Sequence, residues 1–173
     1  MKLLSIVFSF KNEEKNLPEL IERTAKSLSE LASWKYEMIF VNDCSTDKSE
    51  EILLKLQTKY PIRIVNMSRN FGVGPCVLAG FKLAKGDAIV YIDSDLQDPP
   101  EIIKELVKEH ENGAEVVHTV RTKRLGESKI KMFLTLVAYK IINFFSDIPL
   151  HVNAGDFKLI SRKALDKILE LNE

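Results

Sequence analysis

The sequence AIVYIDSDLQDPPE, residues 88–101, places an apolar strand, an acidic turn and a helix start one after another. Its first part, Ala88–Ile92, is an almost unbroken apolar run, as expected for a parallel strand covered on both faces. Its last part, Asp98–Glu101, has an acceptor at the cap position, prolines in the first turn and a glutamate at the third position, which is typical of a helix N-terminus. A strand followed directly by a helix is the repeating unit of a parallel α/β sheet.

The same alternation of strand and helix extends on both sides of this segment. Short runs rich in Ile, Val and Phe predict strands at Leu3–Phe8, Glu37–Val41, Ile62–Met67, Ala88–Ile92 and Glu115–Val120. Helical spacing of apolar residues predicts helices at about Glu13–Ala32, Asp47–Lys59, Val73–Ala84 and Pro100–Glu111. Asp47 and Glu50 read as a capping box, and Ser161 reads as the cap of a last helix. We predict an α/β fold with a Rossmann-like, mostly parallel sheet flanked by helices.

Composition favours one globular domain over residues 1–173. Of the 173 residues, 45% are hydrophobic and 29% charged, so a substantial core is expected. The 25 basic and 25 acidic residues cancel, which argues against a nucleic-acid partner. The cysteines Cys44 and Cys76 are too few for a disulfide framework and favour a reduced, cytoplasmic setting. We find no signal peptide, and the apolar segment Met132–Phe145 is shorter than the ~20 residues that a membrane span needs.

The acidic turn after Ala88–Ile92 is the first candidate site, because ligands of parallel sheets bind beyond the carboxyl ends of the strands. Asp93, Asp95 and the side-chain carbonyl of Gln97 are hard oxygen donors, which suit Mg²⁺ or Mn²⁺ better than Zn²⁺. If the backbone turns there, both carboxylates can converge on one cation that holds a diphosphate. The alternative is a polar turn without a ligand. We assign Asp98 to helix capping.

Two further strand ends carry polar residues with two interpretations each. Asp43 follows the second strand and is either an acceptor for a nucleotide base or ribose, or a turn residue. After the first strand, Asn12 is a candidate helix cap, and Glu13 and Glu14 favour the positive end of the helix. Capping would explain these three residues without any ligand.

Other familiar motifs are incomplete. Gly72-Val73-Gly74 precedes a helix, as in phosphate-binding turns, but Val77 stands where a dinucleotide-binding fingerprint has its third glycine. The chain also lacks a Walker-type sequence, so dehydrogenase and ATPase functions lose their main support. The histidines His110, His118 and His151 have no metal-ligand spacing.

A basic segment, residues 121–131, follows the acidic region, and an apolar helical face follows it in turn. The acidic strand end could bind a metal, and the basic segment that follows it could bind an anion. The apolar face fits a helix lying on a lipid headgroup layer, with a core helix or a subunit contact as the alternative. This face contains Ile130, Phe133, Leu134, Val137, Ile141, Phe144 and Phe145.

Several motifs, in their order along the chain, resemble those of the family 2 glycosyltransferases. They are Asn12-Glu13-Glu14, Val41–Asp47, Ser68–Gly72, Ala84–Asp87 and Ile92–Glu101. Together with Val120-Arg121, Gly126–Ser128 and Gly155–Phe157, they are similar to the subgroup that loads a sugar onto polyprenyl phosphate, such as bactoprenol glucosyltransferases. The resemblance implies a GT-A fold, a UDP- or GDP-sugar donor, a divalent metal and inverting transfer.

The resemblance also implies roles for individual residues. The residues implied to contact the nucleotide are Ser9, Lys11, Glu13 and Asp43. The residues implied to bind the metal and diphosphate are Asp93, Asp95 and Gln97. Arg121 and Arg124 would grip the phosphate of donor or acceptor. Asp156 matches the aspartate proposed on the acceptor side as the catalytic group. The family usually has proline and tyrosine where this chain has Ser9 and Lys11.

The subgroup usually continues through amphipathic helices and membrane spans beyond the Gly-Asp-Phe motif, so we expect this chain to lack that part. The resemblance implies that the protein acts at the inner face of the cytoplasmic membrane. A homo-oligomer is an open alternative to a monomer. Two other functions remain in play: transfer to a sugar hydroxyl, and a nucleotide-sugar-binding module without turnover. A sugar nucleotidyltransferase is disfavoured because residues 9–14 contain no glycine.

Overall fold

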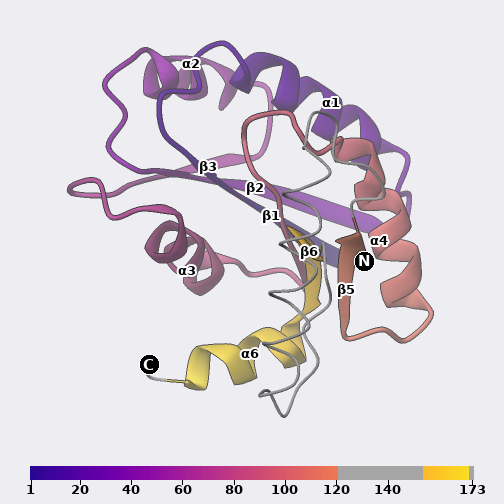
Figure 1. Cartoon of the computed structure of the whole chain (residues 1–173). Helices are drawn as coiled ribbons and strands as arrows, with labels where there is room; N and C mark the ends of the chain where they lie inside the picture. Colours follow the sequence, from indigo (N-terminus) through magenta and orange to yellow (C-terminus); the bar gives the residue numbers. More distant parts are fainter. Residues whose placement is uncertain (121–153, 172–173) are drawn as a thin grey trace, which may run out of the picture. The chain divides into compact units, whose positions relative to one another are not determined.

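The structure, a computed structural model, describes residues 1–120 and 154–171. One compact unit consists of Met1–Val117 and Asp156–Glu173, and His118–Gly155 form a second unit, of which only the two ends are described. Figure 1 traces the described elements of the first unit, in which a central sheet carries helices on both faces. Arg121, Arg124 and the apolar face between Ile130 and Phe145 lie outside the described residues.

Within the described residues, the sheet has six strands in the order β3-β2-β1-β4-β6-β5. Their bounds are β1 Lys2–Phe10, β2 Trp34–Asn42, β3 Ile62–Asn66, β4 Ala88–Tyr91, β5 Val116–Val120 and β6 Ala154–Ser161. Strand β1 pairs in parallel with β2 and β4, and β2 pairs in parallel with β3, whereas β6 runs antiparallel to β4. The mostly parallel α/β sheet that the sequence predicts is confirmed. Strand β6 was not predicted.

The helices in the described part of the chain are α1 Leu17–Ser29, α2 Ser49–Leu56, α3 Val73–Leu83, η1 Pro100–Ile102, α4 Ile103–Glu111 and α6 Arg162–Glu170. The sequence prediction places α3, the η1–α4 segment and the Ser161 cap correctly, and the Ser161 hydroxyl accepts the backbone N–H of Ala164 at 3.1 Å. Pro99, however, occupies the N-cap position of η1, so the assignment of Asp98 to that position is wrong.

Helices α1 and α2 begin later than predicted, because the residues before them join two loops together. Asn12 does not cap α1: its side-chain oxygen accepts the N–H of Thr46 at 2.8 Å, and its own N–H donates to the Ser45 hydroxyl. Asp47 accepts the N–H groups of Glu14 and Ser49. The predicted capping box is also wrong, since Glu50 instead accepts the side-chain amide of Asn66.

Two apolar layers, one on each face of the sheet, form the core. On one face, side chains of α1, α2 and α4 pack on even-numbered residues of β1, with Phe8 stacked on Phe40 at 4.4 Å between ring centroids. On the other face, α3 and α6 pack on Val7, Ile39 and Ile89. Figure 1 shows the same arrangement, with α1, α2 and α4 on one side of the strands and α3 and α6 on the other. Because successive side chains of a strand point to opposite faces of the sheet, each strand contributes residues to both layers.

Two glycines let backbone segments approach closely. A Cβ atom on Gly80, in α3, would lie 2.3 Å from Cγ1 of Val7 in β1. A Cβ atom on Gly86 would lie 2.6 Å from both the N atom of Ser5 and the O atom of Ala88. The Ala84–Asp87 motif is therefore a packing element, and the Arg162 guanidinium fixes it by donating to the carbonyls of Ala84 and Gly86.

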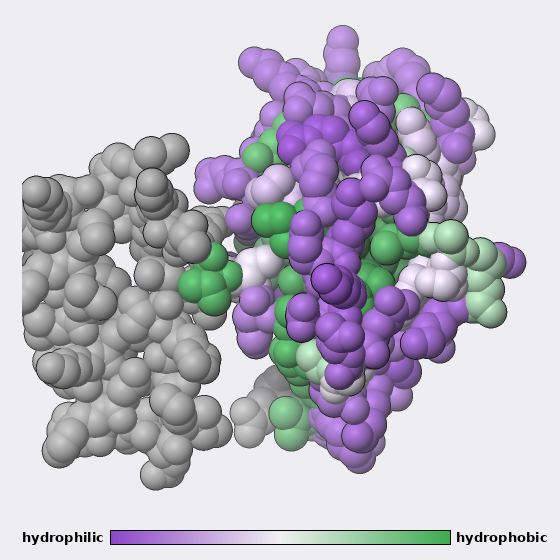
Figure 2. All heavy atoms as spheres, turned by 90° about the vertical axis from the view of Figure 1, so that its right-hand side faces the viewer, coloured by the Kyte–Doolittle hydropathy of each residue, from purple (hydrophilic) through white to green (hydrophobic). Residues whose placement is uncertain are grey.

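On the side drawn in Figure 2, hydrophilic side chains cover most of the described surface, and apolar ones appear between them. Within residues 1–120 and 154–171, no helix is long and apolar enough to cross a bilayer.

We predict that Gly80→Ala destabilises the fold by about 1–3 kcal/mol, because the added methyl group overpacks the α3–β1 contact. The midpoint of urea unfolding measures this change. Gly74→Ala, in the same helix with no atom within 4 Å of the added Cβ, is the matched control and should not lower stability. Equal midpoints for the two variants would contradict the prediction.

Candidate active site

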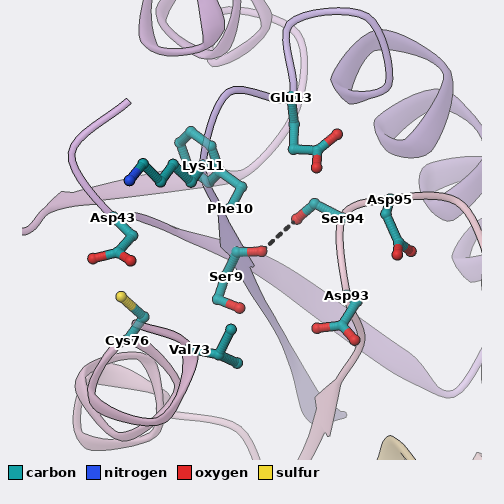
Figure 3. Close-up of a pocket in the computed structure, with 10 residues that line it drawn as sticks. All are labelled: Ser9, Phe10, Lys11, Glu13, Asp43, Val73, Cys76, Asp93, Ser94 and Asp95. Atoms are coloured by element: carbon teal, nitrogen blue, oxygen red, sulfur yellow. Dashed lines mark hydrogen bonds between the residues drawn. The ribbon is translucent and has the colours of Figure 1, made fainter. Parts of the chain in front are cut away.

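A cavity of about 310 Å³ opens at the carboxyl ends of β1, β2 and β4. It is lined by Ser9, Phe10, Lys11, Glu13, Asp43, Val73, Cys76, Asp93, Ser94 and Asp95. Strands β2 and β3 lie on one side of β1 and β4 lies on the other, so the strand order reverses beside β1. Open α/β sheets bind ligands at such a switch point. The structure therefore brings most of the predicted site residues together (Figure 3).

Acidic side chains outnumber basic ones among the described residues that line the cavity. Glu13, Asp43, Asp93 and Asp95 are the acidic ones, and Lys11 is the one basic side chain in this described set. Figure 3 shows these acids coming from three separate loops, with Asp43 on one side of the cavity and Asp93 and Asp95 on the other. A diphosphate entering alone would meet net repulsion, whereas a diphosphate with a divalent cation would not.

Asp93, the second residue after β4, is half-buried, and its Oδ1 accepts the Tyr91 hydroxyl at 2.5 Å. Burial raises the pKa of Asp93 above its usual range, and the charges of Asp95, Asp156 and Asp98 raise it further, while the hydrogen bond from Tyr91 opposes these effects. The carboxylate is held in place by its neighbours at a cost in electrostatic free energy. Such a group is typical of functional sites.

Asp95 reaches the same cavity because the chain turns between the two aspartates and the helix. Leu96 adopts the left-handed conformation with φ 61°, and Oδ1 of Asp95 accepts the N–H of Gln97 at 3.0 Å. Within the described residues, the second oxygen of Asp93 and of Asp95 has no hydrogen-bond partner. Hard carboxylate oxygens with open positions around them fit Mg²⁺ or Mn²⁺.

The protein supplies only part of a coordination shell in the part of the chain that the structure describes. There, no three His, Cys, Asp or Glu side chains gather as a metal-binding group. Gln97 is exposed and is not among the cavity-lining residues, and its contribution seen here is the backbone N–H that fixes Asp95. A cation would therefore need oxygens from a bound ligand to complete its shell.

Asp43 is buried and holds the loop before α3. Its two oxygens accept the N–H groups of Phe71 at 2.7 Å and Gly72 at 2.9 Å, and Gly72 has a φ of 86° that favours glycine. Cys76 lies beside it, and burial, together with the charge of Asp43, raises the pKa of the Cys76 thiol to about 11. The thiol is protonated at neutral pH, in keeping with a structural cysteine.

The end of β1 contributes Ser9, Lys11 and Glu13. The Ser9 hydroxyl lies 2.9 Å from the Tyr91 hydroxyl, and the Ser9 carbonyl accepts the Ser94 hydroxyl at 2.8 Å, the dashed line in Figure 3. Lys11 is exposed at the cavity. Glu13 accepts the side-chain amide of Asn16, which orients its carboxylate.

Asp156 lies on β6, next to the acidic turn. The antiparallel register pairs Tyr91, the last residue of β4, with Lys158, which lies two residues after Asp156 in the chain. Asp156 is exposed, and its charge contributes to the raised pKa of Asp93. The fold thus places the predicted acceptor-side aspartate beside the predicted metal-binding aspartate.

Known proteins share this arrangement. The family described as "Glycosyl transferase family 2" matches residues 5–169 of the chain. The chain belongs to glycosyl transferase family 2. This family 2 domain is 43% identical over 171 residues to an uncharacterized glycosyltransferase of Synechocystis sp., covering 98% of this chain and 54% of the relative. It is 35% identical over 171 residues to the bactoprenol glucosyl transferase of Shigella phage SfV, covering 98% of this chain and 55% of the relative.

A solved structure shows the same fold as this family 2 domain. It is glucosyl-3-phosphoglycerate synthase from Mycobacterium tuberculosis, crystallised with Mn²⁺, UDP-glucose and phosphoglyceric acid. The TM-score is 0.65 at 22% identity, over 94% of this chain and 57% of that chain. The GT-A fold implied by the sequence motifs is confirmed. The chain spans about half the length of the curated relatives it matches.

Sequence reasoning missed Tyr91, Ser94 and Cys76 at the site of this family 2 domain. Tyr91 was read as part of an apolar strand, although it stands two residues before Asp93 and on the same side of that strand. The period-two alternation is the signal that would have found it. Ser94 and Cys76 carry no comparable local signal, since their places at the cavity depend on contacts with β1 and β2.

We predict that Asp93→Asn raises the free energy of unfolding at pH 7 by about 0.5–2 kcal/mol, the usual gain from one stabilising substitution. The change removes a half-buried charge, while the amide oxygen can still accept the Tyr91 hydroxyl. Because the pKa of Asp93 is raised in the folded state, its stabilising contribution is present at low pH and lost as the pH rises through that pKa.

Urea unfolding of both proteins at several pH values measures this effect, and the stability gap should widen from pH 4 to pH 7. Asp166→Asn, on the exposed surface of α6, is the matched control and should produce no such gap. A wild-type protein that is more stable than Asp93→Asn at pH 7 would refute the prediction.

Proposed function

We propose that this chain is the catalytic part of a glycosyltransferase that moves a sugar from a nucleotide-diphosphate sugar to a polyprenyl phosphate. The observation that carries the proposal is the acidic cavity at the switch point of the sheet, where Asp93 and Asp95 each keep one carboxylate oxygen without a protein partner among the described residues. Membership of the family and the bactoprenol glucosyl transferase among the relatives support it.

Asp93 and Asp95 would hold Mg²⁺ or Mn²⁺, with Gln97 as a further ligand proposed from the sequence motif. When bound, the cation neutralises negative charge on the diphosphate of the donor. The incomplete protein shell fits this arrangement, because diphosphate oxygens and water would fill the open positions. The Mn²⁺ and UDP-glucose in the mycobacterial structure support this assignment for the shared fold.

The nucleoside would lie on the other side of the cavity, toward Glu13 and Asp43. Each oxygen of Asp43 already accepts one loop N–H, and a carboxylate has about four acceptor sites, so it retains capacity for base or ribose donors. Lys11 would offset charge on the diphosphate, and the Ser9 end of β1 would border the nucleotide. A UDP-sugar and a GDP-sugar are both compatible with this wall.

Asp156 would work on the acceptor side, beside Asp93. A lipid phosphate monoester has a second pKa near ~6, so it is largely ionised at neutral pH and needs little deprotonation. Asp156 would then orient the acceptor phosphate. An oxygen of that phosphate would attack the anomeric carbon of the sugar with inversion, the bond from this carbon to the diphosphate would break, and the nucleoside diphosphate would leave. Arg121 and Arg124 would bind phosphate. With a sugar hydroxyl as acceptor, Asp156 would have to act as the general base. The work would take place at the inner membrane face, where the lipid acceptor lies.

We predict that Mn²⁺ and nucleotide bind cooperatively, because the two aspartates alone leave the cation under-coordinated. Calorimetry with UDP and with GDP, in Mn²⁺ and then in EDTA, should give at least tenfold tighter binding of one nucleotide with the metal, in the usual range of coupling between sites. Asp95→Asn should abolish the gain, whereas Asp166→Asn should preserve it. Nucleotide affinity that is the same in Mn²⁺ and in EDTA would reject the proposed metal site.

We predict that Asp156→Asn has little effect on transfer to polyprenyl phosphate but lowers transfer to a sugar hydroxyl by about 10²–10⁴-fold, the usual contribution of a general base. Radiolabelled sugar transfer to each acceptor measures both rates. An undiminished rate with a hydroxyl acceptor would remove Asp156 from the catalytic role. Metal-dependent nucleotide binding with no transfer to either acceptor would instead favour a binding module without turnover.

A further inference from the structure

Tyr91 ends β4 with its side chain 3% exposed, yet its hydroxyl is in contact with two polar groups at the cavity. It lies 2.9 Å from the Ser9 hydroxyl and donates to Oδ1 of Asp93 at 2.5 Å. Among the residues described here, Tyr91 is the one side chain that donates a hydrogen bond to Asp93. Neither the family motifs nor the proposed function assigns it a role.

The direction of the hydrogen bonds follows from counting protons. A tyrosine hydroxyl carries a single proton, and that proton is directed at Asp93, so the Ser9 hydroxyl must donate to the Tyr91 oxygen. The result is an ordered relay from Ser9 through Tyr91 to Asp93. Each hydroxyl donates its proton in a hydrogen bond to the next residue of the relay, so both hydroxyls have a defined orientation.

The surroundings hold this relay in one position. The Tyr91 ring packs edge-on against Phe81 of α3 at 6.4 Å between centroids, on the buried α3–α6 face of the sheet. The residue after Asp93 is also anchored to β1, because the Ser94 hydroxyl donates to the Ser9 carbonyl at 2.8 Å. Asp93 is therefore restrained both through its side chain and through the backbone that follows it.

We propose that Tyr91, oriented by Ser9, is a positioning residue that holds Asp93 for the divalent cation. The hydroxyl occupies Oδ1 and fixes the plane of the carboxylate, which leaves the other oxygen to ligate the cation. Hydrogen-bond partners of metal-ligating carboxylates orient their ligands in this way. This inference rests on the proposed function, because it presupposes a metal at Asp93.

A merely structural role makes a different prediction. If the two hydroxyls only satisfied each other in a buried place, removing one would lower stability and leave metal affinity unchanged. A positioning role requires the Mn²⁺ dissociation constant to change beyond any change in stability. Metal affinity, measured apart from turnover, separates the two roles.

The test is Mn²⁺ titration, followed by the electron paramagnetic resonance signal of free Mn²⁺, with saturating UDP or GDP, whichever binds the wild-type protein. Tyr91→Phe keeps the ring and removes the hydroxyl, and it should weaken Mn²⁺ binding by roughly 10- to 100-fold, the usual effect of losing such a partner. Ser9→Ala should weaken it less. With nucleotide saturating for every variant, the double variant should match Tyr91→Phe alone in Mn²⁺ affinity, since the Ser9 hydroxyl acts on Asp93 through the Tyr91 hydroxyl.

Tyr36→Phe is the matched control, because Tyr36 is a partly buried tyrosine of β2 that packs in the other apolar layer of the sheet from Tyr91. It should leave Mn²⁺ affinity unchanged, and thermal melting of every variant identifies any that fails to fold. If Tyr91→Phe misfolds, Ser9→Ala alone decides, and a weakened Mn²⁺ affinity in that folded variant supports the proposal.

Unchanged or tighter Mn²⁺ binding in folded Tyr91→Phe would overturn the positioning role while the proposed function stands. Equal weakening in Tyr91→Phe and Tyr36→Phe would overturn it as well, because the effect would then be general. Wild-type protein that binds no Mn²⁺ with either nucleotide would overturn the proposed metal site and this inference together.

Discussion

The burial of one carboxylate, Asp93, among other acids at one edge of the sheet is the constraint on which this site depends. Burial and neighbouring acids raise the pKa of Asp93. The ionised carboxylate is therefore less stable here than it would be in water and far from other acids. The scaffold opposes this cost with a hydrogen bond from Tyr91 and with the Ser94 anchor on β1. A divalent cation bound with a diphosphate would offset the repulsion between the carboxylates, which is the role that the proposed function gives to this acidic cavity.

The motif residues of the first two loops divide between structure and site. Asn12 and Asp47 join the loops after β1 and β2 by hydrogen bonds to the opposite backbone, and these bonds account for both residues without any ligand. Asp43 does both kinds of work, because its carboxylate holds the Phe71–Gly72 backbone and also lines the cavity. Loss of function at Asp43 would therefore not by itself prove nucleotide contact.

Family membership and geometry support the proposed sugar transfer from separate directions. The family match covers residues 5–169, while the cavity is built from strand ends that any parallel α/β sheet would bring together. The chain spans about half of the relatives it matches, so acceptor recognition is the part of the function that most needs experiment. In the proposed function, Asp156, whose charge acts on Asp93, would link the donor and acceptor sides.

The sequence alone determined the parallel sheet, helix α3 and the placing of Asp93, Asp95 and Asp43 at one edge. These follow from local periodicity and from the rule that parallel strands end together. Tertiary structure decided the late starts of α1 and α2, the antiparallel strand β6 and the Ser9–Tyr91–Asp93 relay. Each of these depends on partners far apart in the chain, such as Asn12 with Thr46 or Ser9 with Tyr91, and no local pattern encodes the meeting of two distant side chains.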